Sequence, residues 1–482
     1  MTTEALALIV FLPLLAAAGA VVLPKAWLAL MIRIGLLPLP VLLLIPTLEV
    51  AHNGAYRVAL AGHDSPLGIA WQLDPLSLLM LWLNVGMTLL VSLHAGFSFR
   101  PGSDRAQRFW PLWLLLFAGM NALVLSADLF NIYVTLELVT LTAIGLIAVE
   151  GKPAALRAAM RYLLLALMAS LLYLLGVGLI YGETGVLDLY MMTDRLEPGW
   201  LAITAMALMI VGLLIKAAIF PLHAWLPAAH GNAPGPVSAI LSAMVVKVSI
   251  YLIWRLWFWS ASEWNLDTAA QLMGVLGGLA IIYGSLAALV QPRLKMIIAY
   301  STVAQLGYLL LLFPLASALA FQAASYHLIS HGMAKAAMFL AAANILKSVG
   351  TDRLSRLAGI DQRLPLDVFA LALGGVSIMG LPPSGGFLAK WLFLEAAWQA
   401  KAWGWLILVV LGGLLAAAYL FRVLAVICLH PRRHGGQASV RRAPNLASVA
   451  ALLLALGAIV AGFTSAPILD LVEAGLPPGL QP

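Results

Sequence analysis

Long apolar stretches, separated by short connections that carry charge, proline or glycine, fill most of the sequence. A bilayer-spanning helix needs about 20 mostly apolar residues, and the chain has room for about fourteen such helices. The pattern predicts an all-α polytopic membrane protein without a sizeable extramembrane domain. We expect spans near residues 5–24, 26–47, 75–97, 109–126, 128–149, 157–181, 200–222, 234–258, 269–290, 295–315, 318–346, 365–399, 403–429 and 446–470.

Composition excludes a soluble globular protein and several kinds of redox centre. The 482 residues are 63% hydrophobic and only 10% charged, whereas soluble domains are about 25% charged. The single cysteine, Cys428, rules out an internal disulfide, an iron–sulfur cluster and a thiolate zinc site within the chain. We therefore expect no cofactor and no metal, and any redox centre must lie in another subunit. The chain itself is expected to be a transport subunit, not an enzyme.

The positive charges are distributed unevenly between the connections. Loops after odd-numbered spans hold seventeen Lys and Arg, and loops after even-numbered spans hold four: Arg57, Arg195, Arg255 and Lys401. By the positive-inside rule the first set faces the cytoplasm, which places both termini on the outer side. The net charge of +7 then comes from cytoplasmic loops, and no nucleic-acid partner is expected. We predict a bacterial cytoplasmic (inner) membrane location, with the lipid bilayer as the surrounding medium.

Five ionisable residues fall well inside predicted spans. Each charged side chain at a helix centre costs about 2.5–3.5 kcal/mol on insertion scales, so such residues usually face a bundle interior or a water-filled path. A single one could be a lysine that snorkels to the interface or a structural ion pair, but five in five spans favour a functional set. They are Glu137, Lys216, Lys247, Lys335 and Lys390.

Proton transfer gives a reason for lysine at these positions. Burial disfavours a charged ammonium, whereas a nearby carboxylate favours it, so a buried lysine beside a movable glutamate can hold or release a proton. Glu137 is the carboxylate expected to control Lys216. Lys247, Lys335 and Lys390 are expected to form successive steps of a relay in the plane of the membrane, connected by water.

Two predicted spans are interrupted by proline and glycine near a buried lysine. Prolines 221 and 227 follow Lys216 in the seventh span, and the segment 380–386 precedes Lys390 in the twelfth. Either break alone could be a simple kink, but interrupted segments at matching places of two halves indicate a transport site. The match predicts two inverted five-helix repeats, spans 4–8 and 9–13. The expected parts are 1–97, 109–258, 269–429 and 446–482.

Four histidines accompany the lysines. His327 and His331 share one helix face with Lys335, because the three recur every four residues. They could be polar side chains satisfied by packing, but histidine titrates near neutrality and favours a proton-carrying stripe. Haem or zinc binding is disfavoured, since no third ligand is evident. His223 and His230 flank the break after Lys216, where they could admit protons from the cytoplasm or serve as interfacial anchors.

Several of these segments resemble one protein family. Residues 129–137, 216–230, 299–308, 327–340 and 380–391 are similar to motifs of the antiporter-like subunits shared by respiratory complex I, membrane-bound hydrogenases and multisubunit cation/proton antiporters. The resemblance covers nearly the whole chain. It implies a fourteen-helix fold with inverted repeats, proton conduction along a central polar axis and assembly beside related membrane subunits in a hetero-oligomeric complex.

The resemblance also implies roles for individual residues. Glu137 matches the family's fifth-helix carboxylate, Lys216 the lysine of its broken seventh helix, Lys247 its eighth-helix relay residue and Lys390 its terminal twelfth-helix residue. Some members have glutamate at this last position, and Lys390 argues against that branch. Length and lysine pattern look most like the D-type member of the sodium/proton antiporter complexes, with the smallest antiporter-like component of complex I close behind.

These observations support one leading hypothesis and three alternatives. The leading one is a proton-translocating subunit of a multisubunit Na⁺/H⁺ antiporter, with H⁺ as the ion that it moves and Na⁺ as a candidate for a second. The second places the same chain in a complex I-type NADH:quinone oxidoreductase or a membrane-bound hydrogenase. The third is a stand-alone Na⁺-coupled transporter of an organic solute, which would favour carboxylates at the breaks. A purely structural scaffold leaves the buried charges unexplained.

Overall fold

The computed structural model describes residues 2–429 and 445–481, and most of them are helical. Within this part of the chain, eleven helices are long and apolar enough to cross a membrane. Three shorter apolar helices, Trp200–Lys216, Pro365–Met379 and Leu446–Val460, lie within other expected spans. The fold class predicted from the sequence is confirmed, while the count of fourteen spans stays a prediction. The α-helices are α1 (Thr2–Val22), α2 (Leu28–Leu36), α3 (Leu39–Asn53), α4 (Pro75–Ser98), α5 (Asp104–Leu125), α6 (Leu129–Ala148), α7 (Pro153–Thr184), α8 (Leu189–Thr193), α9 (Trp200–Lys216), α10 (Leu226–Asn232), α11 (Gly235–Ile240), α12 (Val246–Trp254), α13 (Asp267–Val290), α14 (Leu294–Leu309), α15 (Leu312–Leu315), α16 (Ala318–Val349), α17 (Pro365–Met379), α18 (Gly385–Gln399), α19 (Trp403–Leu424), α20 (Asn445–Val460) and α21 (Ala466–Ala474).

Shorter elements interrupt or join these helices. A wide, π-helical turn precedes α12, and similar turns follow α12 and α19. Short 3₁₀ turns lie in the connections. The π-helical turns are η3 (Leu241–Val245), η4 (Arg255–Ser260) and η6 (Ala425–Leu429), and the 3₁₀ turns are η1 (Lys25–Trp27), η2 (Leu60–Gly62), η5 (Leu354–Arg356) and η7 (Pro478–Leu480).

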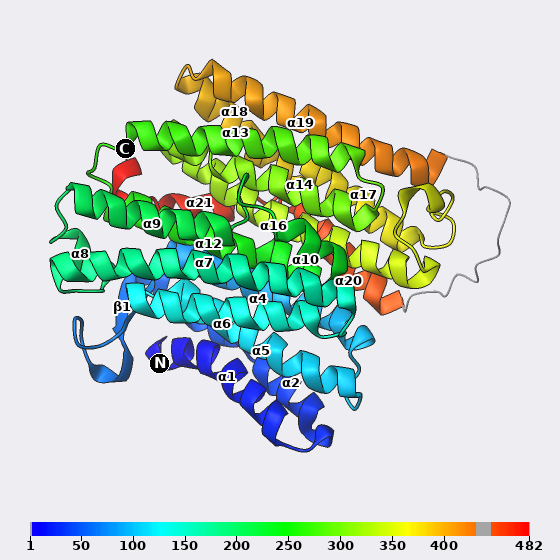
Figure 1. The fold of residues 1–482 in the computed structure, drawn as a ribbon, viewed down its shortest axis with the longest axis horizontal. Coiled ribbons are helices and arrows are strands. Elements are labelled where there is room, and N and C mark those ends of the chain that lie inside the picture. The colour runs from blue at the N-terminus through cyan, green and yellow to red at the C-terminus, as the bar shows by residue number, and fades with distance from the viewer. Residues whose placement is uncertain (1, 430–444, 482) are drawn as a thin grey trace.

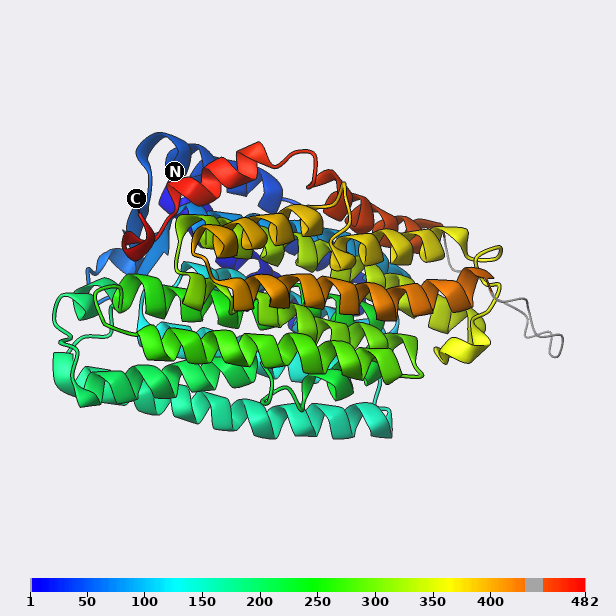
Figure 2. The same cartoon turned by 90° about the horizontal axis from the view of Figure 1, so that it is seen from above.

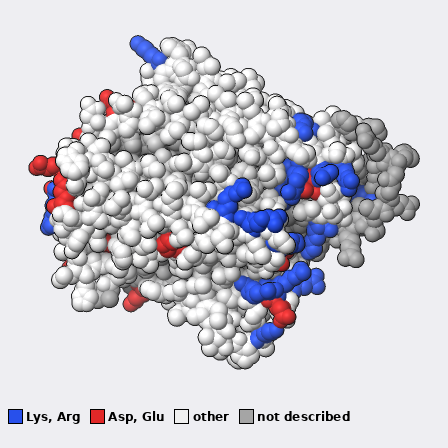
Figure 3. Space-filling model, viewed as in Figure 1, with Lys and Arg blue, Asp and Glu red and all other residues white. Residues whose placement is uncertain are grey.

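The long helices lie side by side with their axes close to one direction (Figures 1 and 2). Both labelled chain ends lie in the half of the molecule that also contains α8 (Figure 1). On the face drawn in Figure 3, most Lys and Arg side chains gather toward the opposite end, and most Asp and Glu side chains gather toward the end nearer α8. The positive-inside argument depends on this separation of basic from acidic side chains. The orientation of the termini in the membrane stays a prediction.

A small β-hairpin is the one strand structure in the described residues, and the sequence analysis did not predict it. Strands β1 (Tyr56–Ala59) and β2 (Ala70–Leu73) pair antiparallel in the connection between α3 and α4. Val58 and Trp71 of the hairpin are buried. The alternation of buried and exposed residues is too short to stand out against the surrounding apolar sequence.

The second and the last of the expected spans are each divided, in addition to the spans predicted to be broken. The second is divided into α2 and α3 near Pro38 and Pro40, as expected when proline removes a helical donor. In the last expected span, α20 ends at Val460, and α21 begins only at Ala466. At Gly462 a Cβ atom would lie only 1.9 Å from the carbonyl oxygen of Pro383. The end of α20 is therefore packed directly on the interruption between α17 and α18.

Two isolated β-bridges occupy matching places in the two expected five-helix units. Asp128, just before α6, bridges Asp188, just before α8. Arg293, just before α14, bridges Arg353, just before η5. In each bridge the residue after one partner donates its N–H to the residue before the other, and the reverse bond is also made. This shared detail supports an internal repeat, whose inverted topology stays a prediction.

Glycine lets α7 and α9 approach closely. A Cβ atom added at Gly176 would lie 2.6 Å from the carbonyl oxygen of Ala205, and one at Gly212 would lie 2.5 Å from that of Ala169. Small residues at such crossings allow two helix backbones to pack in a membrane protein. The position of α9, which carries Lys216 at its end, is set by this contact.

Candidate functional site

Glu137 and Lys216 form an ion pair across two helices. Glu137 projects from the middle of α6, and Lys216 is the last residue of α9. The Lys216 Nζ atom lies 3.2 Å from Oε1 of Glu137 and donates to Oγ1 of Thr140 at 2.9 Å. The lysine side chain is 3% exposed and the glutamate side chain 19%. The end of α9 also favours a cation, because the last carbonyl groups of a helix carry partial negative charge.

Lys247 and Lys335 both lie near polar side chains of α14. Lys247 Nζ donates to the carbonyl oxygen of Ser242 at 2.6 Å, and the Ser242 hydroxyl lies 3.0 Å from that of Thr302. The neighbouring residue on α14, Ser301, accepts a hydrogen bond from Lys335. Both lysines are fully buried. Thr302 therefore lies one contact away from Lys247, through Ser242, and Ser301 contacts Lys335 directly.

His327 and His331 continue from Lys335 along α16, as their spacing predicted. Their rings stack with centroids 5.4 Å apart. His327 Nε2 lies 3.1 Å from the carbonyl oxygen of Gln305, whereas neither ring nitrogen of His331 has a hydrogen-bond partner in the described part of the chain. A buried imidazole without a partner leaves two polar atoms unsatisfied, which indicates a place where water can bind.

Lys390 lies at the far end of this series, in the second broken helix. It projects from α18 and donates to the carbonyl oxygens of Ile378 at 2.8 Å and Met379 at 3.0 Å, at the end of α17. Its ammonium also lies 5.1 Å from the ring centre of Tyr308. The Tyr308 ring is in turn 5.3 Å from that of His327. Lys390 is thus connected to the histidines through an aromatic side chain of α14.

We call Glu137, Lys216, Lys247, Lys335, Lys390, His327 and His331 the ionisable row. Its four lysines are at most 6% exposed, and Lys390 also lines a hollow together with the exposed side chains of Leu381 and Trp391. Among the described residues no direct hydrogen bond joins Lys216 to Lys247, although α9 packs against α12. Water is needed to complete a path between these two lysines.

His223 and His230 occupy different surroundings. His223 lies in the interruption after α9, where its ring is 5.4 Å from that of Phe220 and 5.0 Å from that of Tyr283. His230 is completely buried and stacks on Phe339 of α16 at 4.6 Å. Both ring nitrogens of His230 are without a partner among the described residues. His230 therefore resembles the histidines of the row more than His223 does.

Two residues that complete the Glu137–Lys216 pair were missing from the sequence-based set. Thr140 lies three residues after Glu137, on the same face of α6, and this spacing could have identified it. Ser170 of α7 donates a hydrogen bond to Glu137. No local signal in the sequence places Ser170 opposite Glu137, because the contact depends on how α6 and α7 pack.

Arg255, expected in an outer loop, is in fact buried. It forms an ion pair at 2.5 Å with Asp74, the residue that caps α4, and its guanidinium lies 4.5 Å from the ring centre of Trp259. Burial on its own would raise the pKa of Asp74, but the charge and hydrogen bond of Arg255, together with the hydrogen bonds from Ser77, outweigh it, so the pKa of this carboxyl lies below its usual value. Lys295, also expected in a loop, is 2% exposed and bonds to the carbonyl oxygen of Ala233 at 2.6 Å.

Another buried carboxylate that the sequence analysis did not single out is Asp367. Asp367, in the first turn of α17, is 1% exposed. It accepts hydrogen bonds from Asn344 at 2.8 Å and from Ser448 at 2.9 Å, and Asn344 in turn contacts His94 at 2.9 Å. Asn344 lies nine residues after Lys335 on α16, and at 100° per residue that places it on the opposite face of the helix. This network therefore joins α4, α16, α17 and α20 outside the ionisable row.

The fold and the row together define an integral membrane protein that encloses ionisable side chains within a helical bundle. A comparison with known proteins then gives the family. The family described as "NADH:quinone oxidoreductase/Mrp antiporter, TM" matches residues 126–416, and the chain belongs to it. The match includes the ionisable row and both broken helices.

Individual relatives span both branches of this family. The N subunit of NADH-quinone oxidoreductase from Desulforudis audaxviator is 34% identical, over 88% of this chain and 87% of that protein. The D subunit of the Na⁺/H⁺ antiporter from Alkalihalophilus pseudofirmus is 28% identical, over 87% of this chain and 85% of that protein. The chain is thus an antiporter-like membrane protein with relatives in redox and antiporter complexes.

Solved structures give the same result. A chain of the archaeal membrane-bound sulfane sulfur reductase has a TM-score of 0.88 at 27% identity, covering 98% of this chain and 97% of that one. A chain of the Mrp complex from Dietzia has a TM-score of 0.83 at 26% identity, covering 98% of this chain and 96% of that one. Both neighbours are parts of membrane complexes.

Proposed function

We propose that the chain is the proton-translocating subunit of a multisubunit membrane complex and that protons pass along the ionisable row. The observation that carries this proposal is the burial of four lysines in a series of helices, with a carboxylate at only one of them. A set of ordinary structural ion pairs would give each lysine its own carboxylate, since an unpaired buried charge is costly. Lysines that meet hydroxyl and carbonyl groups instead can exist without their proton.

In the proposed mechanism the Glu137–Lys216 pair controls the state of the row. When Glu137 lies against Lys216, the negative charge holds the proton on the lysine. When the pair separates, burial favours release of that proton toward Lys247 through water. Water beside the hydroxyls of Ser242, Thr302 and Ser301 then carries the proton from Lys247 to Lys335.

Transfer beyond Lys335 would use the two histidines. His331 and His327 lie on the same face of α16 as Lys335, and imidazole can accept a proton on one nitrogen while it donates from the other. Lys390 receives the proton at the second break. His230, buried and without a partner among the described residues, is a candidate for supplying protons to the row from the cytoplasmic side.

Lys335→Met tests the row at its centre. We expect the complex to assemble and its proton movement, measured as a pH gradient in proteoliposomes, to fall by at least about 100-fold, the usual contribution of one proton-transfer group. Lys347→Met is the matched control, because Lys347 lies on the same helix but is exposed. Unchanged transport in Lys335→Met, with the complex intact, contradicts the proposal.

Two kinds of complex are compatible with this function. An Na⁺/H⁺ antiporter complex is the arrangement expected from the sequence, and the relatives from antiporters support it. The higher identity to the relative from NADH-quinone oxidoreductase favours a complex driven by redox chemistry in other subunits. Purification of the chain with its partners separates the two, since cysteine-rich peripheral subunits indicate the redox complex and small membrane-only subunits indicate the antiporter.

A further inference from the structure

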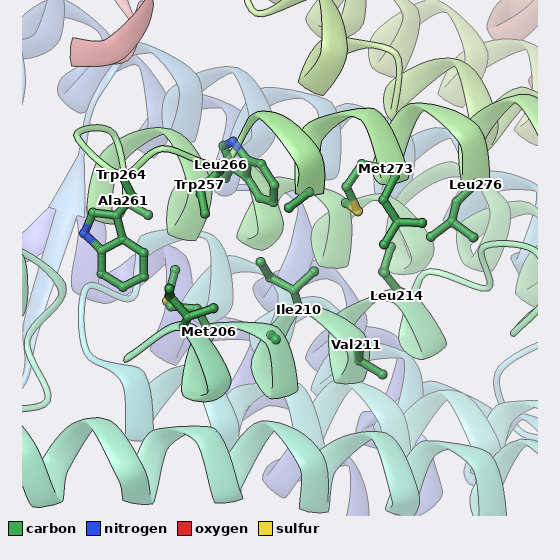
Figure 4. Close-up of a pocket in the computed structure, with 14 residues that line it drawn as sticks. Met206, Ile210, Val211, Leu214, Trp257, Ala261, Trp264, Leu266, Met273 and Leu276 are labelled. Carbon is green, nitrogen blue, oxygen red and sulfur yellow. The ribbon is translucent and has the colours of Figure 1, made fainter. Parts of the chain in front are cut away.

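An apolar groove lies between α9 and α13, at the joint between the two five-helix units. It encloses about 200 Å³. Figure 4 shows Ile210 and Leu214 on one side and Met273 and Leu276 on the other, with their side chains directed toward the same space. Val211 of α9 also lines the groove. Val211 is 41% exposed. The groove therefore opens to the lipid-facing surface.

A polar hollow of about 340 Å³ adjoins this groove. Trp257 and Trp264 line both spaces. The polar hollow also contains Asp267, the first residue of α13, and Gln271 one turn later. It lies at the end of α13 for which the charge distribution predicts the outer side of the membrane. Tryptophan is typical of this level, where hydrocarbon meets the headgroup region.

We propose that the groove and the hollow together bind one phospholipid with an ammonium headgroup, such as phosphatidylethanolamine. An acyl chain lies along α9 and α13, and the headgroup ammonium lies beside Asp267. The lining contains one carboxylate and neither lysine nor arginine. An anionic headgroup would meet a like charge there, whereas an ammonium meets its opposite.

The shape of the groove favours a flexible chain over a transmembrane helix of a partner. Helices pack in membranes where glycine, alanine or serine allow their backbones to approach. This groove is lined mainly by Met, Leu, Ile and Trp, with alanine only at positions 207, 261 and 269. A single hydrocarbon chain can fill the uneven space between such side chains.

This site does not depend on the proposed transport function. Its position nevertheless connects it to the row, because Leu214 lies two residues before Lys216 on α9. A lipid seated between α9 and α13 would hold the first five-helix unit against the second at this point.

Filling the groove tests the acyl-chain half of the site. Ala207 is exposed in the groove, so Ala207→Phe adds a ring there without disturbing the core. We expect phosphatidylethanolamine binding to the purified complex, measured by native mass spectrometry during titration, to weaken about 100-fold, as when about four methylenes leave an apolar contact. Ala418→Phe, at an exposed alanine of α19, is the matched control and should leave binding unchanged.

Removing one charge tests the headgroup half. We expect Asp267→Asn to weaken phosphatidylethanolamine binding about fivefold, the size of an exposed ion pair, whereas Glu263→Gln in the neighbouring connection has no effect. Equal binding by wild type and Ala207→Phe overturns the proposal, and so does a preference for phosphatidylglycerol over phosphatidylethanolamine. A photo-crosslinker at position 207 that captures a protein subunit instead of lipid also overturns it.

Discussion

The two broken helices place an ammonium group at the same structural position by different means. In the first, Lys216 is the last residue of α9 and meets the carboxylate of Glu137. In the second, Lys390 reaches back from α18 to the final carbonyl groups of α17. Both ammonium groups thus lie at the C-terminal end of a half-helix, where the helix dipole favours a cation. Of the two, Lys216 alone has a fully charged partner among the described residues.

This difference suggests separate roles for the two lysines: Lys216 is suited to control the proton, and Lys390 is suited to accept it. A carboxylate on a side chain can move away or become protonated, and either event changes how firmly the lysine holds its proton. Backbone carbonyl groups can do neither. We therefore expect the first unit to regulate the row and the second to accept what the row delivers.

The largest effect should follow removal of Lys216. Lys216→Met takes away the group that exchanges protons with the row, and we expect proton movement to fall by at least about 100-fold. Assembly should persist, because Glu137 keeps Ser170 as a partner and is partly exposed. Quenching of a pH-sensitive dye in proteoliposomes measures the loss. Wild-type rates in this variant would show that Lys216 takes no part in proton transfer. The two lysines at the broken helices could then not be compared as parts of one mechanism.

A smaller loss is expected for Glu137→Gln, which keeps the shape and the hydrogen bonds of the pair but not its charge. We expect the transport rate to fall about 10- to 100-fold, because a close charge partner changes how firmly the lysine holds its proton by about that factor. Glu150→Gln is the control, since Glu150 pairs with Lys152 at the surface end of α6. If both variants transport equally well, the charge of Glu137 has no regulatory role.

The second unit can be made to resemble the first. Thr302 follows the bridge residue Arg293 by nine residues, as Glu137 follows Asp128. Thr302→Glu would place a carboxylate close to Lys247, and we expect the proton to be held there and transport to slow by about tenfold. Thr302→Gln, of similar size but neutral, should transport faster than Thr302→Glu. Equal rates in the two variants would show that volume, not charge, matters at this position.

The smallest effect concerns the hydroxyl that supports the ion pair. Thr140→Val removes one hydrogen bond to Lys216, and we expect transport to fall about threefold, within the range for a typical intramolecular hydrogen bond. Thr142→Val, whose hydroxyl bonds to carbonyls of its own helix, should behave as wild type. A greater loss in Thr142→Val would argue against this use of Thr140.

Much of this arrangement could be predicted from the sequence because burial of charge in a membrane is so costly. Lys216, Lys247, Lys335 and Lys390 stand out against apolar neighbours, and proline and glycine mark both breaks. Partners that depend on packing between distant segments could not be predicted. The carbonyls of residues 378 and 379 have no side-chain signal, and the Asp74–Arg255 pair joins residues 181 positions apart.

Arg255 shows a second reason why a prediction from the sequence can be wrong. A charged residue near the end of an apolar stretch can lie either in a loop or within the bundle, and hydropathy alone does not separate the two. Whether such a residue lies within the bundle depends on whether a carboxylate is present at the same depth in the membrane to pair with it. For Arg255 that carboxylate belongs to Asp74, outside any predicted span, so the pattern of the local sequence favoured the loop.

The π-helical turn η3 places an extra residue in the chain just before α12, the helix that carries Lys247. A π turn contains more residues than an α turn, and Lys247 contacts the carbonyl of Ser242 within this turn. If the turn tightened by one residue, α12 would rotate by about 100° and carry the lysine away from Ser242. Deleting Ala243 should fix that second register, so these five residues contain the means to make and break one contact without displacing a whole helix.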